Sequence, residues 1–303
     1  MAEGVKVRVP GTTANCGPGF DAVGIACSIY NEMTLTLSND GKCVISVTGE
    51  GEGAIPGNER NIAFQAVNLV LERLKLNYSG IRIEMNNNVP LARGLGSSAA
   101  AIVAGLVAAN AATGNKLTRE DILDIATSME GHPDNVAPAI FGGVSVSIMD
   151  GKKPHSLKFM PSIPLKMVVA VPDFTLSTKA ARQVLPKEVP FQDAVFNVSR
   201  SALLIGALSK GRVDLLQYAL DDKLHQSYRQ RLIPGMPEVL KAAVAAGALG
   251  ATLSGAGPCL IAYTLGSEAK IGEAMVKTFA EHDVKAKYLS LDIDAEGAKV
   301  VTC

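Results

Sequence analysis

The chain of 303 residues is long for a single hydrophobic core, so two domains are expected. Its 29 basic and 29 acidic residues give a formal net charge of zero, which argues against a binding surface for nucleic acid or for an anionic membrane. A composition of 48% hydrophobic and 19% charged residues is typical of a soluble globular enzyme. The five cysteines form no C-x-x-C pair, and neither an apolar leader nor a long apolar span occurs, so a cytoplasmic location is expected.

The N-terminal half alternates strands with helices. The pattern of apolar and polar residues predicts strands at residues 5–9, 29–37, 44–47, 81–85 and 142–148. Helical spacing of apolar residues predicts helices at residues 61–76, 97–112 and 118–130. Residues 10–24 are expected to form one long turn. A stretch containing Gly, Lys and Pro at residues 150–154 predicts a boundary between a first domain, residues 1–153, and a second, residues 154–303.

The C-terminal half has a different rhythm. Strands are predicted at residues 166–171, 248–253, 259–264 and 284–291. Helices are predicted at residues 177–181, 191–208, 213–220, 237–246 and 268–281. The order is a strand, helices, two strands, a helix and a strand, which is the split-βαβ, ferredoxin-like plan with extra helices inserted. The whole chain is therefore expected to be of the α+β class.

The most informative segment is V-P-L-A-R-G-L-G-S-S-A-A-A at residues 89–101. Gly94 and Gly96 allow the backbone to approach a ligand closely. The predicted helix then opens at Ser97 and Ser98, where unpaired amides, the positive end of the helix dipole and two hydroxyls converge. This arrangement predicts an anion site suited to a polyphosphate.

Other interpretations of this segment are weaker. It satisfies the dinucleotide pattern G-x-G-x-x-A, but a dinucleotide site has its first glycine directly after a strand, and strand 81–85 ends well before Gly94. The P-loop pattern G-x-x-x-x-G-K-[ST] does not occur. A tight turn followed by a buried, alanine-rich helix would explain the glycines and alanines, but it leaves Ser97 and Ser98 unexplained.

Two further turns hold polar or glycine-rich sequence beyond the needs of packing. In residues 10–21, Asn15 and Asp21 are the hydrogen-bonding side chains, and an ordinary Asx-turn loop is the alternative. Residues 250–258 form either a plain glycine hairpin or a backbone surface that closes over a bound phosphate or substrate.

The sequence E-G-H-P-D-N at residues 130–135 places four chemically capable side chains at the end of a predicted helix. Capping of this helix by its glycine, and of a following short helix by Asp134 or Asn135, is the alternative. That alternative leaves Glu130 and His132 unexplained, although a lone histidine is often structural.

Two arginines could bind a substrate carboxylate through bidentate, charge-assisted contacts. They are Arg182 and Arg229, and Arg231 is a close rival of the second. In a neutral protein, a solvated surface position is the alternative for each of them.

These segments resemble a known superfamily. Residues 90–100, 10–21 and 254–258 are similar to the three signature segments of the galactokinase, homoserine kinase, mevalonate kinase and phosphomevalonate kinase (GHMP) superfamily, in the same order across almost the whole chain. Residues 130–138 and 229–235 resemble the homoserine kinase family in particular. The resemblance implies a two-domain GHMP kinase fold, with an N-terminal half like ribosomal S5 domain 2 and a ferredoxin-like C-terminal half.

The resemblance also implies an activity, which is transfer of the γ-phosphoryl group of ATP to the side-chain hydroxyl of L-homoserine in threonine biosynthesis. It implies that Ser98 and Glu130 hold Mg²⁺ and that Asn61 lies near the adenosine. A homodimer is expected from the family alone. The loop around the triphosphate would consist of Pro90, Leu91, Ala92, Arg93, Gly94, Leu95, Gly96, Ser97, Ser98, Ala99 and Ala100.

For the amino acid, the resemblance implies a set of polar side chains around one small molecule. Asp21 would bind the ammonium, and Arg182 with Arg229 would bind the carboxylate. The family's spacing before Leu-Ile-Pro-Gly selects Arg229 over its rival. The residues expected to line the pocket around the hydroxyl are Asn15, His132 and Asn135.

The identity of a general base stays open at this stage. Asp134 is the nearest candidate carboxylate, whereas Asn135 could instead orient the hydroxyl, because a loose transition state needs little help from a base. Two other functions remain as alternatives. One is a kinase of the same superfamily that acts on mevalonate or a sugar, and the other is a ligand sensor that kept the fold without the transfer.

Overall fold

The computed structural model describes residues 4–301, and residues 1–3 and 302–303 lie outside this description. The first half of the chain, joined by β11 from its C-terminal end, builds a seven-stranded sheet in the order β11-β1-β2-β4-β3, with β5 paired to β2 and β6 paired to β5. Its strands are β1 (Val5–Ala14), β2 (Val23–Ser38), β3 (Cys43–Gly49), β4 (Gly80–Asn87), β5 (Val144–Asp150), β6 (Lys153–Phe159) and β11 (Lys299–Val301).

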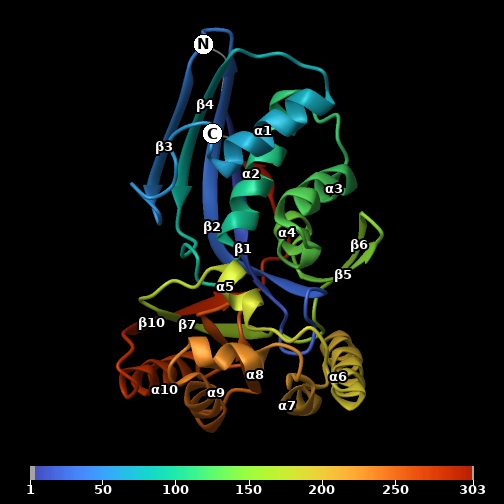
Figure 1. The fold of residues 1–303 in the computed structure, drawn as a ribbon, viewed down its shortest axis with the longest axis vertical. Helices are drawn as coiled ribbons and strands as arrows, with labels where there is room; N and C mark the ends of the chain where they lie inside the picture. Colours follow the sequence, from blue (N-terminus) through green and yellow to red (C-terminus); the bar gives the residue numbers. More distant parts are fainter. Residues whose placement is uncertain (1–3, 302–303) are drawn as a thin grey trace.

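Helices cover one face of this sheet (Figure 1). They are α1 (Ile62–Arg73), α2 (Ser97–Ala112), α3 (Arg119–Glu130) and α4 (Pro133–Phe141). Helix α2 is buried on nearly all sides, and its small residues let α1 pack closely against it. Gly105 is one such residue, because a Cβ there would lie 2.5 Å from the carbonyl oxygen of Ala63. The predicted capping box is present, because Thr118 and Asp121 each satisfy the other's backbone amide.

The second half builds a four-stranded antiparallel sheet in the order β10-β7-β9-β8. Its strands are β7 (Lys166–Pro172), β8 (Gly250–Leu253), β9 (Leu260–Thr264) and β10 (Ala286–Asp292). Its α-helices are α5 (Thr178–Gln183), α6 (Phe191–Lys210), α7 (Leu216–Ala219), α8 (Gln226–Arg229), α9 (Met236–Ala245) and α10 (Glu268–Ala280). Short 3₁₀ turns are η1 (Val213–Leu215) and η2 (Gln230–Leu232). This strand order confirms the predicted ferredoxin-like plan.

The two sheets share a core at their junction. Val23 and Ile25 of β2 pack in one apolar cluster with Met167 and Val169 of β7, and all four side chains are buried. This cluster also includes Leu95 of the Gly/Ser-rich loop, so the loop is anchored where the two halves of the molecule meet.

The expected long turn at residues 10–24 is wrong. Strand β1 continues to Ala14, and its residues 11–14 pair with residues 24–27 of β2, so the turn spans only residues 15–22. Every residue from Val9 to Ala14 is buried, which removes the alternation of apolar and polar residues that marks a half-buried strand.

The sheets divide the chain at a different place from the expected boundary after residue 153. That position falls at the start of β6, which pairs with β5 in the first sheet. The chain reaches the second sheet only between Phe159 and Lys166, and β11 returns to pair with β1. Within residues 4–301, no helix is long and apolar enough to cross a bilayer.

Candidate active site

One cavity of about 380 Å³ lies where the two halves meet. Its wall includes the start of α1, the Gly/Ser-rich loop, the junction of α3 and α4, and the turn at residues 15–22 from the first half. From the second half it takes α5, α8 and the hairpin at residues 254–258. Segments that are far apart in the sequence therefore meet around one space of the size that small ligands occupy.

The Gly/Ser-rich loop is held by close backbone packing. Gly94 and Gly96 have left-handed φ values of +81° and +67°. A Cβ at Gly94 would lie 2.2 Å from the carbonyl oxygen of Ser254, and one at Gly96 would lie 2.0 Å from Oγ1 of Thr12. The Oγ of Ser254 lies 2.7 Å from the carbonyl oxygen of Gly94. The glycines thus allow the loop to fit against the hairpin and β1. The sequence allows two explanations for them, a close approach of the backbone to a ligand and a tight turn, and their left-handed φ values fit the turn.

The start of α2 presents an anion-binding end to the cavity. Gly96 is the N-cap and supplies no side-chain hydrogen bond to the first turn, so the amides of that turn have no capping side chain, and Ser97 and Ser98 of the turn line the cavity. The strand before the loop ends at Asn87, well before Gly94, as the argument against a dinucleotide site requires.

Ser98 and Glu130 are in contact at the N-terminal end of α2. Glu130 is the last residue of α3, and Gly131 ends that helix with a left-handed φ of +93°. The hydroxyl of Ser98 donates a 2.9 Å hydrogen bond to Oε2 of Glu130, and both residues line the cavity. Two oxygen ligands beside an anion-binding helix end suit a hard divalent cation such as Mg²⁺.

The segment after Gly131 forms a polar chain that ends at Asn135. Thr12 donates a 2.8 Å hydrogen bond to Oδ1 of Asn135, which fixes the amide orientation. The Oδ1 of the buried Asp134 lies 2.5 Å from Nδ1 of His132 and 3.4 Å from Nδ2 of Asn135. The N-cap of α4 is His132, without a side-chain capping bond, so the alternative interpretation is wrong in having Asp134 or Asn135 cap α4 and right in having Gly131 end α3.

The pKa of His132 reflects this partner. Burial lowers the pKa, but the hydrogen bond to Asp134 and the negative charges of Asp134 and Asp21 outweigh it, and the net shift is upward. The carboxylate of Asp134 is therefore already engaged by the ring of His132.

Asp21 and Arg182 form a bidentate ion pair. The guanidinium of Arg182 donates hydrogen bonds of 2.7 and 3.1 Å to the two carboxylate oxygens of Asp21. These bonds raise the pKa of Arg182 despite its partial burial. The sequence interpretation gave the two side chains separate substrate groups, and the structure pairs them with each other.

Arg229 is buried in the cavity wall. Its Nε donates to the carbonyl oxygen of Ala181 at 3.1 Å, and its Nη1 donates to that of Gly255 at 3.1 Å. No carboxylate within residues 4–301 lies in salt-bridge range of it. Burial, followed by the positive charge of Arg182, lowers its pKa to about 10. Arg231 is exposed and lies outside the cavity wall.

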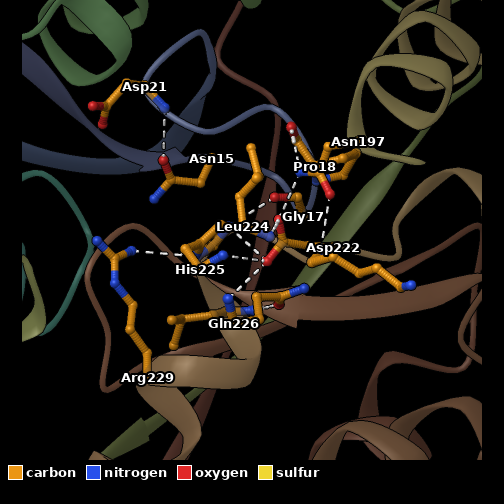
Figure 2. Close-up of polar contacts among 12 residues, drawn as sticks. Asn15, Gly17, Pro18, Asp21, Asn197, Asp222, Leu224, His225, Gln226 and Arg229 are labelled. Carbon is orange, nitrogen blue, oxygen red and sulfur yellow. Dashed lines mark hydrogen bonds and ion pairs between the residues drawn. The ribbon is translucent and has the colours of Figure 1, made fainter. Parts of the chain in front are cut away.

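Asn15 braces the turn between β1 and β2. It is buried, and its Oδ1 accepts the backbone N–H of Asp21 at 3.0 Å (Figure 2). Its Nδ2 donates to the carbonyl oxygen of Gly255 at 2.8 Å. The amide thereby joins the turn that holds Asp21 to the hairpin on the other side of the cavity.

At the far end of the cavity, Asn61 is the N-cap of α1. Its Oδ1 accepts from the amide of Ala63 at 2.9 Å. Sequence reasoning missed Asn31 and Asn87, which line the same end and are partners in the β2–β4 register. The only available signal was a polar residue at a buried position of a strand, and that signal does not distinguish a binding group from a packing irregularity.

Known protein families match both halves of the chain. The family model described as GHMP kinases N terminal domain matches residues 61–143, and the one described as GHMP kinases C terminal matches residues 204–281. The homoserine kinase of Moorella thermoacetica is 47% identical over 97% of this chain and 99% of its own length. That of Carboxydothermus hydrogenoformans is 46% identical over 97% of this chain and 96% of its own length.

Solved structures give the same result. The crystal structure of homoserine kinase from Cytophaga hutchinsonii has a TM-score of 0.92 and 34% identity, and the match covers 99% of this chain and 98% of that one. The mevalonate kinase of L. major, solved with R-mevalonate, has a TM-score of 0.70 at 21% identity and shares the fold. Identity at this level over nearly the whole length shows that the chain belongs to the homoserine kinase family of the GHMP kinases.

Proposed function

We propose that this enzyme binds ATP and L-homoserine in the cavity between its two halves and transfers the γ-phosphoryl group to the side-chain hydroxyl. The observation that carries the substrate assignment is the buried guanidinium of Arg229, which has no carboxylate partner within residues 4–301 and lines the cavity near Asp21. A buried, unpaired charge is costly, and a substrate carboxylate would compensate it. Asp21 accepts two hydrogen bonds from Arg182, and its carboxylate oxygens keep further lone pairs that can accept hydrogens from an ammonium group. Together they match an amino acid, whereas mevalonate has no ammonium and a sugar has no carboxylate.

We assign the nucleotide to the other part of the cavity. The first turn of α2 offers amides to the phosphates, and residues 90–100 enclose this end, while Asn61 lies toward the base. Ser98 and Glu130 would hold Mg²⁺, because their oxygens meet at this helix end. The bound ion would neutralise charge on the phosphates as it develops. The intact pair also argues against a ligand sensor, which needs no metal.

For the acceptor hydroxyl, Asn135 is the better candidate than Asp134. Thr12 holds the Asn135 amide in one orientation, which suits a group that positions a hydroxyl. Asp134 is buried and engaged by His132, so we assign it the role of orienting its neighbours rather than that of a general base. Positioning and charge neutralisation supply most of the rate of phosphoryl transfer.

We also propose a homodimer for the assembled enzyme. The supporting observation is an exposed apolar stripe on α6, formed by Phe191, Val195 and Val198 at helical spacing. Its burial against a second copy would remove this surface from water.

The test of the function is an ADP-release assay with ATP, Mg²⁺ and one acceptor at a time. L-Homoserine should give by far the highest kcat/KM, and L-serine, mevalonate and galactose should serve as poor acceptors. Comparable turnover of mevalonate or galactose would exclude the amino-acid assignment.

A further inference from the structure

Behind Arg229 lies a buried histidine that the proposed reaction does not use. His225 is fully buried and precedes α8 by one residue, so it lies one helical turn before Arg229. Its Nδ1 is 3.3 Å from Nη1 of Arg229, and its Nε2 is 2.8 Å from the carbonyl oxygen of Gly17 (Figure 2). The ring therefore bridges the helix that carries Arg229 and the turn that carries Asn15 and Asp21.

The two contacts fix the tautomer of the ring. A carbonyl oxygen only accepts hydrogen bonds, so Nε2 of His225 carries the hydrogen that it donates to Gly17. In the neutral ring, Nδ1 then has a lone pair, which accepts a hydrogen from Nη1 of Arg229. The Nε of Arg229 donates to Ala181, and its Nη1 donates to both Gly255 and His225. Its Nη2 makes no hydrogen bond within residues 4–301.

The surroundings favour the neutral ring. Burial lowers the pKa of His225 and the positive charge of Arg229 lowers it further, whereas the charges of Asp222 and Asp21 and the hydrogen bond to Gly17 raise it. The net shift is downward, so the ring stays neutral at physiological pH. These three charged groups face the ring from the segment before α8, from α8 and from the turn at residues 15–22.

Asp222 holds the histidine in place through the backbone. Its carboxylate accepts the N–H groups of Leu224, His225 and Gln226 at 2.9, 2.9 and 2.7 Å, and it also accepts Nδ2 of Asn197 at 2.8 Å. Four donors around one buried carboxylate fix the start of α8 against α6. The position of the His225 ring is thus determined independently of any ligand.

We propose that His225 is a positioning residue for the substrate carboxylate. As a neutral acceptor, it holds Nη1 of Arg229 so that the remaining N–H groups face the cavity in the geometry that a carboxylate needs. The inference rests on the proposed function, in which Arg229 binds that carboxylate. It differs from a packing role, because the bond to Arg229, the bond to Gly17 and the stacking on Phe20, with ring centres 5.2 Å apart, can be separated by substitution.

Two substitutions separate the two ring nitrogens. In His225→Asn the amide oxygen can take the place of Nδ1 and accept from Arg229, while the bond to Gly17 is lost. In His225→Gln the amide nitrogen can take the place of Nε2 and donate to Gly17, while the acceptor for Arg229 is lost. We expect His225→Gln to raise the KM for L-homoserine about 10-fold, and His225→Asn to stay within about threefold of wild type, since one hydrogen bond to a charged group is at stake. The KM for ATP should hardly change in either variant.

Because KM does not depend on the fraction of folded enzyme, a partly unfolded variant cannot mimic this result. The double variant His225→Gln/Arg229→Ala should have the same KM for L-homoserine as the single variant Arg229→Ala. A KM for L-homoserine that is unchanged in His225→Gln, or raised equally in both histidine variants, would overturn the inference. If Arg229→Ala itself leaves that KM unchanged, the carboxylate assignment under the proposed function fails instead, so the two failures are distinguishable.

Discussion

At the scale of single residues, the buried guanidinium of Arg229 is the group whose removal should be most informative. It lines the cavity, whereas Arg231, two residues later, is exposed. A desolvated, charge-assisted arginine–carboxylate contact contributes about 2–4 kcal/mol, so Arg229→Ala should lower kcat/KM for L-homoserine by about 30- to 1000-fold. Arg231→Ala is the matched control and should change kcat/KM less than about threefold. The opposite ranking in steady-state kinetics would show that the arginine assignment is wrong.

A second residue-scale prediction concerns His132 and pH. Its pKa is raised in the folded protein by Asp134 and Asp21, so its charge stabilises the fold below the unfolded pKa of about 6.5. This contribution is lost as the pH rises through the raised, folded value. His132→Asn should therefore reduce the free energy of unfolding more at about pH 5.5 than at about pH 9. Urea melts of both proteins at the two pH values measure this, and an equal loss at both would contradict it.

At the scale of elements, the sequence predicted α2, α3 and the ferredoxin-like strand order, because long, strongly periodic segments carry their own signal. It failed at residues 10–14, where β1 is buried continuously, and at α4 and α8, which are short and held by tertiary contacts. The cavity residues were predicted largely by resemblance. Their mutual contacts, such as the ion pair of Asp21 with Arg182, depend on segments brought together only by the fold.

The start of α2 provides the element-scale prediction. Gly96→Ala places a methyl group in a left-handed backbone and against Oγ1 of Thr12, the group that orients Asn135. Gly114→Ala, just after the same helix, meets the same left-handed cost with nothing within 4 Å. Gly114→Ala should lower the free energy of unfolding by about 1 kcal/mol, and Gly96→Ala should lower it by more than that. Only Gly96→Ala should also lower kcat, by about tenfold or more. Equal kcat values for the two variants would show that neither Thr12 nor the loop helps to set the catalytic geometry.

At the scale of the whole molecule, the site exists only because two sheets share a core at their junction. Apolar residues of β2 and β7 pack together there, and both halves line the cavity in which we propose a nucleotide end and an amino-acid end. The chain crosses between the halves after β6 and again before β11, so the first half is built from two separate segments, whereas the second half is one continuous segment between them. This joint construction explains why the two ends of the cavity can be aligned for transfer between ligands bound side by side.

The most direct measurement is phosphorus NMR of the reaction of the purified enzyme with ATP, Mg²⁺ and L-homoserine. The account predicts that the γ-phosphate signal of ATP is replaced in equal amount by ADP and by one phosphate monoester, coupled to the methylene protons next to the side-chain oxygen of homoserine. Release of inorganic phosphate without this ester, or an ester that forms on another acceptor and not on L-homoserine, would contradict it.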